Sequence, residues 1–489
     1  MSATKKIVGS LVAATALWLG GTAYVSSNTE GYLKNYVDKT NSLYTQNGMK
    51  LIIEKFDKGF FSSDAKLKID FVEPTLRQVV AETLKLPIDI NYTIENGPLF
   101  FKNGLGMGMS RIDNNMKVSD YLVDKEAFLK MFNDDVLLES STTIDFFKNA
   151  SFSAISNKIV ANVDEDKMYI TPLKMNGDFN VKTFQGKVQM LVDSVTSENE
   201  IAGINAKNIV LDADITKFFD NGFYLGDFAF DVGSLSIKSK NLPFVLDEAI
   251  IHMDMNINEN EDKTIDMQFK VDADTGKSKL PEDYSSLKKV ELAYALNGTK
   301  LEGLLAFQDF SKRLQTRQQE LMLKLTSPKT GEMDMKALQE FENFEKDMQG
   351  DMMLMLAGLL KKDSSNLAVE MKMLDKKDKE STLNMKFAYV GDEALPTTAK
   401  ELEEKFTKDF LNLLAVDINI GLDKEYIANL PERFKQELSG QLQVGAMFGV
   451  VKDNNTSYNL DVNYKPKVLT VNGQDRTEML QMLELGLPQ

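Results

Sequence analysis

The chain has 489 residues, of which 43% are hydrophobic and 27% are charged. This composition excludes an intrinsically disordered chain and predicts roughly three domain-sized cores. Its net charge of −16 repels a phosphate backbone, so nucleic acid binding is not expected. The chain has no cysteine and one histidine. Disulfide scaffolds, thiol nucleophiles, thiolate metal sites and catalytic units with two imidazoles are therefore excluded.

Residues 7–25 carry no charge and follow Lys5 and Lys6. As a helix this segment rises about 28 Å, close to the thickness of the hydrocarbon core of a bilayer. Lysines at the N-terminal side hold that end in the cytoplasm. The sequence therefore predicts a cytoplasmic N-terminus at residues 1–6, a transmembrane anchor at residues 7–25, and a chain that lies otherwise outside the cytoplasm.

A cleaved signal peptide is the alternative interpretation of this segment. Gly21, Thr22 and Ala23 are small residues of the kind that a signal peptidase requires. Trp18 and Tyr24 favour the anchor, because aromatic side chains near the outer end hold a helix at the membrane interface. No later apolar run is long enough to span a bilayer, so we expect a single pass. A lipid-modified N-terminus is excluded, since it requires a cysteine.

Most of the chain after the anchor has the pattern of strands. Ser27–Glu30 has capping-box spacing and predicts the start of an amphipathic helix. Apolar and polar residues then alternate with a period of two, for example over 65–71, 209–215 and 265–271. A change of phase at Gly233–Ser234 predicts a bulge or bend. Because strands and helices do not alternate, the pattern favours an antiparallel sheet over a parallel one.

Helical spacing replaces this alternation after residue 303. Apolar residues recur at three- and four-residue steps on both sides of a break at Ser327–Pro328. The predicted fold class is α+β: a long, largely antiparallel curved β-sheet with an inserted amphipathic helical hairpin, plus one N-terminal transmembrane helix. We expect a β-rich region at 26–303, a helical insertion at 304–362 and a C-terminal α+β region at 363–489 that continues the sheet.

Few residues have a pattern that predicts chemistry. His252 lies beside Asp254 on the more polar face of a predicted strand, where a half-exposed structural residue is favoured over a general base. Gly276–Ser278 resembles the end of a phosphate-binding loop, but Val271 stands where that loop requires glycine. The acidic stretch 258–262 lacks the glycine and the closing carboxylate of a calcium loop, so we expect a solvated turn. We therefore predict no catalytic, metal or cofactor-binding residues.

The methionine content is the most unusual feature of the sequence. The chain has 25 methionines, and they are most frequent between Met322 and Met355. Its flexible, polarisable side chain suits an adaptable apolar surface for lipid tails or partner helices. An ordinary core packed against the sheet is the alternative, and it is favoured. The candidate surface for an apolar ligand or a partner consists of Met335, Phe341, Phe344, Met348, Met352, Met355 and Leu359.

Three short segments carry a resemblance to a known family: Phe56–Ser63, Ile94–Pro98 and Leu469–Gly473. Together with the N-terminal anchor they resemble the YdgA-like family of bacterial envelope proteins. The resemblance implies a protein of the inner membrane of a Gram-negative bacterium, with most of its chain in the periplasm. The family often carries histidine where this chain has Asn96, so no role for an imidazole transfers. The YdgA-like family is in turn broadly similar to AsmA-like envelope proteins, whose long curved sheets present apolar grooves and are associated with lipid movement or outer-membrane maintenance.

We expect a non-enzymatic protein that needs no cofactor, contacts the inner membrane through its N-terminal helix and binds an apolar ligand such as lipid in envelope maintenance. The alternative is a structural or assembly factor that forms a homo-oligomer or binds another envelope protein. A carboxylate-based envelope hydrolase is a remote third option.

The anchor and the signal peptide make opposite predictions about the mature N-terminus. If residues 7–25 are an anchor, the protein extracted from its native membrane retains Met1, because no peptidase removes the segment. Intact-mass measurement of the extracted protein checks this. A mature chain that begins near Ala23 would show instead that the segment is a cleaved signal.

Overall fold

The computed structural model describes residues 22–38, 40–41, 48–101, 104–132, 134–163, 166–219, 223–281, 284–325, 335–392 and 395–480. The chain divides into two compact units, Met1–Asn241 and Leu242–Gln489. The division falls inside the region 26–303 that was predicted to be one β-rich region. In each unit the long strands pair antiparallel and are accompanied by helices, which confirms the β-rich antiparallel part of the predicted fold class.

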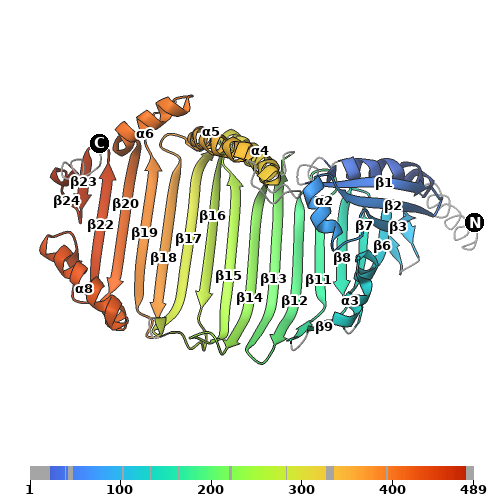
Figure 1. Ribbon diagram of the computed structural model, residues 1–489, viewed down its shortest axis with the longest axis horizontal. Coiled ribbons are helices and arrows are strands. Elements are labelled where there is room, and N and C mark those ends of the chain that lie inside the picture. The colour runs from blue at the N-terminus through green and yellow to red at the C-terminus, as the bar shows by residue number, and fades with distance from the viewer. Residues whose placement is uncertain are drawn as a thin grey trace, which may run out of the picture. The chain divides into compact units, whose positions relative to one another are not determined.

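Unit 1 is built on strands that pair in an antiparallel order along the sheet: β1, β2, β3, β6, β7, β8, β11, β12, β13 and β14 (Figure 1). The hairpin of β9 and β10 joins through β10 to β12. The strands are β1 Met49–Asp57, β2 Ser62–Phe71, β3 Ile88–Asn96, β6 Ser110–Lys117, β7 Leu137–Ile144, β8 Asn149–Ser156, β9 Ile159–Val163, β10 Asp166–Ile170, β11 Leu173–Asn180, β12 Gly186–Glu198, β13 Ala202–Phe218 and β14 Tyr224–Ser239. The short pair β4 Leu99–Phe100 and β5 Gly106–Met107 stands apart. The short helices are α2 Pro74–Ala81, η2 Val118–Tyr121 and α3 Lys125–Met131.

The bulge or bend was predicted at Gly233–Ser234, and the strand pairing shows no bulge at this position. Lys207 pairs with Ser234 and Ile209 pairs with Val232, so no residue is inserted between them. Asn208, between Lys207 and Ile209, instead adopts a left-handed backbone with φ 52°. The unusual backbone conformation at this point of the sheet therefore lies on β13 and not at the predicted position on β14.

A helix at 22–38 belongs to unit 1 and corrects the predicted start of the first amphipathic helix. Ser27 does not cap it, because its hydroxyl donates 2.7 Å to the carbonyl of Ala23 within the same helix. The helix therefore continues through the predicted outer end of the anchor. No helix in the described residues is long and apolar enough to cross a membrane. Of the predicted anchor, only residues 22–25 are described, so the rest of it stays a prediction.

Within unit 2 the strands pair antiparallel in the order β15, β16, β17, β18, β19, β20, β22, β23 and β24, and β21 also pairs with β22. The strands are β15 Leu246–Glu259, β16 Thr264–Asp274, β17 Leu287–Lys300, β18 Asn366–Asp375, β19 Glu380–Tyr389, β20 Leu414–Asp423, β21 Lys452–Asp453, β22 Ser457–Lys465, β23 Val468–Val471 and β24 Gln474–Asp475. The helices are α4 Leu301–Leu325, α5 Met335–Leu359, α6 Ala399–Leu413, α7 Lys424–Ala428 and α8 Glu432–Met447.

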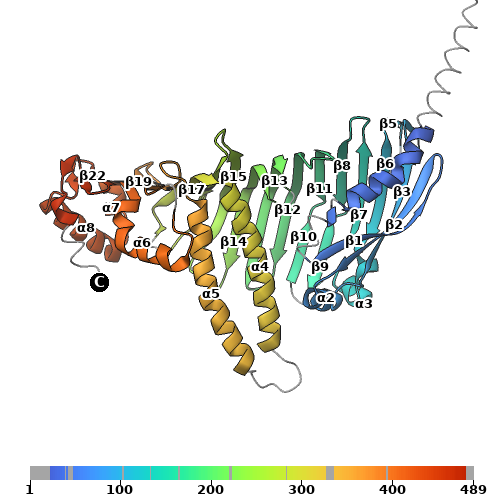
Figure 2. The same ribbon diagram turned by 90° about the horizontal axis from the view of Figure 1, so that it is seen from above.

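The helices α4 and α5 connect two adjacent strands, because β17 leads into α4 and β18 follows α5. They lie side by side and leave the sheet together (Figure 2). They approach closely at the base, where a Cβ added to Gly303 would lie 2.2 Å from the carbonyl oxygen of Gly358. A side chain at residue 303 is therefore excluded by the facing backbone.

This contact gives a matched pair of substitutions. Gly303→Ala forces α4 and α5 apart and should destabilise the hairpin by about 1–3 kcal/mol. Gly358→Ala meets nothing within 4 Å and should be neutral or stabilising by up to about 1 kcal/mol, because alanine favours a helix. Hydrogen exchange in α4 and α5, measured by mass spectrometry, should be faster only in Gly303→Ala. Equal exchange in the two variants would contradict this packing.

Candidate functional site

A cavity of about 410 Å³ lies in unit 1, between the helix at 22–38 and the sheet. Strands β2, β3, β6, β7, β8 and β11 contribute to its wall, and the helix contributes Val25, Thr29 and Leu33. The remaining wall is largely apolar, and among the described residues no acidic side chain belongs to it. Its apolar members from the sheet and the adjoining turns are Leu67, Ile94, Met109, Ile112, Ile144, Ala150, Phe179 and Val181.

The helix is fixed above the cavity by a buried amide. Asn96, at the end of β3, is 3% exposed, and its Oδ1 accepts a hydrogen bond of 2.9 Å from the Thr29 hydroxyl. The Asn96 amide nitrogen in turn donates to the carbonyl of Gly59 at 3.1 Å and to the Ser63 hydroxyl at 3.3 Å. Ser26 also donates to the Gly59 carbonyl, at 2.7 Å. One side chain therefore joins the helix to the β1–β2 turn.

A second contact, at residue 41, attaches the helical segment to β1. The side-chain amide of Asn41 donates 2.8 Å to the Leu51 carbonyl and accepts 2.7 Å from the Leu51 amide. Val25 and Val37 of the same helix are buried. Burying a valine side chain stabilises a fold by about 1.5–3 kcal/mol. The helix therefore packs against the sheet and covers one side of the cavity.

Two lysines at neighbouring turns provide the only charges of the cavity wall within the described residues. Lys148 ends the β7–β8 turn and Lys182 follows β11, and the turns are joined by a 3.0 Å hydrogen bond from the Val181 amide to the Lys148 carbonyl. The positive charge of Lys182, followed by burial, lowers the pKa of the Lys148 amine. The ammonium of Lys148 also lies 5.5 Å from the centre of the Tyr32 ring. Two like charges therefore lie beside an apolar cavity.

Asp145, in the same turn as Lys148, uses its carboxylate within that turn. Burial raises the pKa of Asp145, but hydrogen bonds from Asn149, Phe147 and Lys148 in its own turn outweigh this and leave the pKa below its ordinary value. Both Asp145 oxygens are used within the turn. In the described part of the chain, neither lysine makes an ion pair with a carboxylate. The pair is therefore suited to an anion from outside the protein.

Tyr92 is a neutral polar group of the cavity wall. Burial, with smaller contributions from Tyr36 and Tyr121, raises the pKa of Tyr92 to about 12. Its phenol therefore keeps its proton at neutral pH and adds no negative charge. The cavity combines an apolar interior with a positive margin.

The predicted α5 surface lies in unit 2 and contributes nothing to this cavity. Met352 is 40% exposed, and Phe344, Met348, Met355 and Leu359 are partly buried. Met335 and Phe341 also lie on α5, but the placement of their side chains is outside the described part of the structure. The α5 surface therefore stays a prediction.

His252 and Asp254 are neighbours on β15, as the alternation predicted. His252 Nε2 lies 2.6 Å from Asp254 Oδ2, and both side chains are partly exposed. The pair does not line the unit 1 cavity. It has the position of a polar pair on a strand surface.

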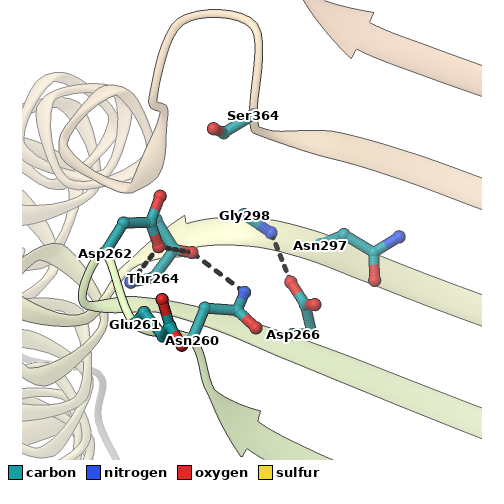
Figure 3. A pocket seen from close by; sticks show the side chains of 8 residues that line it. All are labelled: Asn260, Glu261, Asp262, Thr264, Asp266, Asn297, Gly298 and Ser364. Carbon is teal, nitrogen blue, oxygen red and sulfur yellow. Dashed lines mark hydrogen bonds between the residues drawn. The ribbon is translucent and has the colours of Figure 1, made fainter.

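The acidic turn between β15 and β16 lines a second, polar pocket (Figure 3). Asp262 Oδ1 accepts 2.7 Å from the Thr264 hydroxyl, and the ammonium of Lys361 lies 2.5 Å from Asp262 Oδ2. The hydrogen bond from Lys361 and that from Thr264 lower the pKa of Asp262 to about 2. Asp266 accepts 2.7 Å from the Gly298 amide. These carboxylates hold adjacent loops together, so the unit 1 cavity is the stronger candidate site.

The sequence did not reveal this cavity, because its wall comes from a helix and six strands. Lys148 and Lys182 are 34 positions apart, and only the register that pairs Asn149 with Asn180 brings their turns together. The one local signal was an aromatic residue close to each lysine, Phe147 and Phe184. That signal gave no indication of the partner turn.

The fold and the cavity define a β-rich protein with a helix-covered apolar site. A family model described as "Bacterial protein of unknown function (DUF945)" matches residues 4–478. The chain therefore belongs to this bacterial family. Comparison with curated proteins and with solved structures found no match.

The lysine pair predicts a measurable electrostatic coupling. Lys182→Gln removes the like charge and should raise the pKa of Lys148 toward that of an ordinary lysine, because a nearby cation disfavours the ammonium form. Titration of the amines by NMR after ¹³C-methylation checks this, with Lys238→Gln, at the other end of unit 1, as control. An unchanged Lys148 pKa in Lys182→Gln would contradict the coupling.

Proposed function

We propose that the protein binds a lipid with an anionic headgroup, with the hydrocarbon tail in the helix-covered cavity and the headgroup at Lys148 and Lys182. The carrying observation is the pair of lysines without a carboxylate partner in the described residues, at the margin of a cavity with an apolar wall. Fatty acids and anionic phospholipids share this chemistry. The role is binding without catalysis.

The size and polarity of the cavity support this proposal. Small-molecule sites have volumes of about 300–1,000 Å³ and are mostly apolar, with a few polar groups that fix the orientation of the ligand. The cavity of about 410 Å³ falls within that range. A charged headgroup cannot enter an apolar interior without a large desolvation cost, so it stays at the margin. Hydrogen bonds between ammonium groups and an anion compensate part of that cost.

The location that we propose is the periplasmic side of a bacterial inner membrane, with residues 7–25 as the anchor. The uncharged run after Lys5 and Lys6 supports the anchor. The resemblance of Phe56–Ser63, Ile94–Pro98 and Leu469–Gly473 to the YdgA-like family supports a place in the bacterial envelope. A lipid-binding cavity close to the anchor would lie near the membrane that contains its ligand.

The test is native mass spectrometry of the full chain extracted with its membrane lipids. We expect co-purified lipid on the wild-type protein and at least tenfold lower occupancy on Lys148→Glu/Lys182→Glu, because each charged hydrogen bond contributes about 1.5–3 kcal/mol. Lys238→Glu/Lys240→Glu makes the same change of charge on unit 1 away from the cavity, and should keep the lipid. Both double variants change exposed or partly exposed side chains and leave the core intact.

Two outcomes would contradict the cavity as the lipid site. The first is equal lipid occupancy in the two double variants. The second is lipid that survives the Lys148→Glu/Lys182→Glu change but is lost from Met348→Ser/Met352→Ser/Met355→Ser. That second result would place the ligand on α5, as the sequence predicted.

A further inference from the structure

The exposed phenylalanines of unit 1 lie at one end of its sheet. They are Phe60 and Phe61 in the β1–β2 turn, Phe101 after β4, and Phe146 and Phe147 in the β7–β8 turn. Pairing of Ser62 with Glu95, Asn96 with Ser110, and Ser110 with Ile144 places these turns at the same strand ends. We call this surface the phenylalanine end.

The exposure of these side chains is large. Phe147 is 83% exposed, Phe101 59% and Phe61 54%. Leu105 and Met107, in the same loop region as Phe101, are 82% and 69% exposed. An apolar cluster of this kind on a protein surface marks an interaction site, because large aromatic side chains gain about 1.5–3 kcal/mol when they leave water.

The opposite end of the unit 1 sheet differs in composition. Among the described residues, its exposed apolar side chains include Val79 and Ile201 but no phenylalanine. Both ends consist of turns and short helices between the same strands. The concentration of aromatic residues at one end is therefore not a general property of turns in this unit.

The chain enters unit 1 at the phenylalanine end. Ser26, near the start of the described helix, donates to the carbonyl of Gly59, next to Phe60. The uncharged residues 7–21 directly precede this helix in the sequence. Lys58, Lys148 and Lys182 lie in the turns of the same end. Aromatic and cationic side chains together are typical of protein segments at the headgroup level of a bilayer.

We propose that the phenylalanine end of unit 1 lies in the headgroup region of a lipid bilayer, beside the point where residues 7–21 enter it. The occupant of this apolar surface is the membrane itself. The bilayer covers the phenylalanines, and anionic headgroups neutralise the three lysines. This contact does not depend on whether the cavity holds a lipid.

The absence of cysteine from the chain permits a direct test by site-directed spin labelling. The full chain is reconstituted in vesicles of phosphatidylethanolamine and phosphatidylglycerol, with a single label at Phe60→Cys or Phe147→Cys. Val79→Cys and Ile201→Cys carry the matched labels at the opposite end. Collision of each label with oxygen, which concentrates in the bilayer, is compared with collision with a water-soluble nickel chelate.

We expect the ratio of oxygen to nickel collisions to be several-fold higher for both labels at the phenylalanine end than for both controls. Similar, water-like ratios at all four positions would overturn the proposal. High ratios at all four would also overturn it, because immersion would not be specific to one end. Two labels at each end guard against one substitution that disturbs its turn. Lipid occupancy of Lys148→Glu/Lys182→Glu is a separate measurement, so failure of this proposal is distinguishable from failure of the lipid site.

Discussion

The arrangement of unit 1 depends on the buried side chain of Asn96. Its amide accepts from Thr29 on the helix and donates to Gly59 and Ser63 at the β1–β2 turn. A buried polar group without partners would cost about 1–3 kcal/mol, so each partner is held in place by the others. This network fixes where the helix lies, and the helix in turn closes the cavity. An amide does not titrate near neutral pH, so the attachment does not change with the pH of the compartment.

The sequence predicted individual strands better than it predicted their assembly. Alternation located strands such as β13 and β16, because burial of one face selects a period of two along each strand. It could not locate the cavity, which depends on strand register and on a helix whose capping signal was misleading. The hydroxyls of Ser27 and Thr29 donate to carbonyls four residues earlier. Serine and threonine often begin a helix, but these two lie within the helix at 22–38. The candidate residues on α5 were found by composition, and composition does not distinguish a core from a binding surface.

The methionine-rich helix shows both kinds of environment. On α5, Ala357 is 8% exposed while Leu356, its neighbour in sequence, is 47% exposed. Leu321 on the partner helix α4 is fully buried. Successive helical residues point in different directions, so one face of α5 packs and another contacts solvent. One face of α5 can therefore belong to the core while another is a surface. Each methionine has to be assigned to one of these faces.

The cavity margin and the phenylalanine end are joined by the chain itself. Phe146, Phe147 and Lys148 are consecutive residues of one turn, so a membrane that covers the aromatic side chains also reaches the lysine beside the cavity. An anionic lipid could then keep its headgroup at the interface while its tail exchanges the bilayer for the cavity. Both environments are apolar, so the transfer needs no passage of the tail through water. If the bilayer covers this end of unit 1, its anionic headgroups would balance the charge of the two lysines.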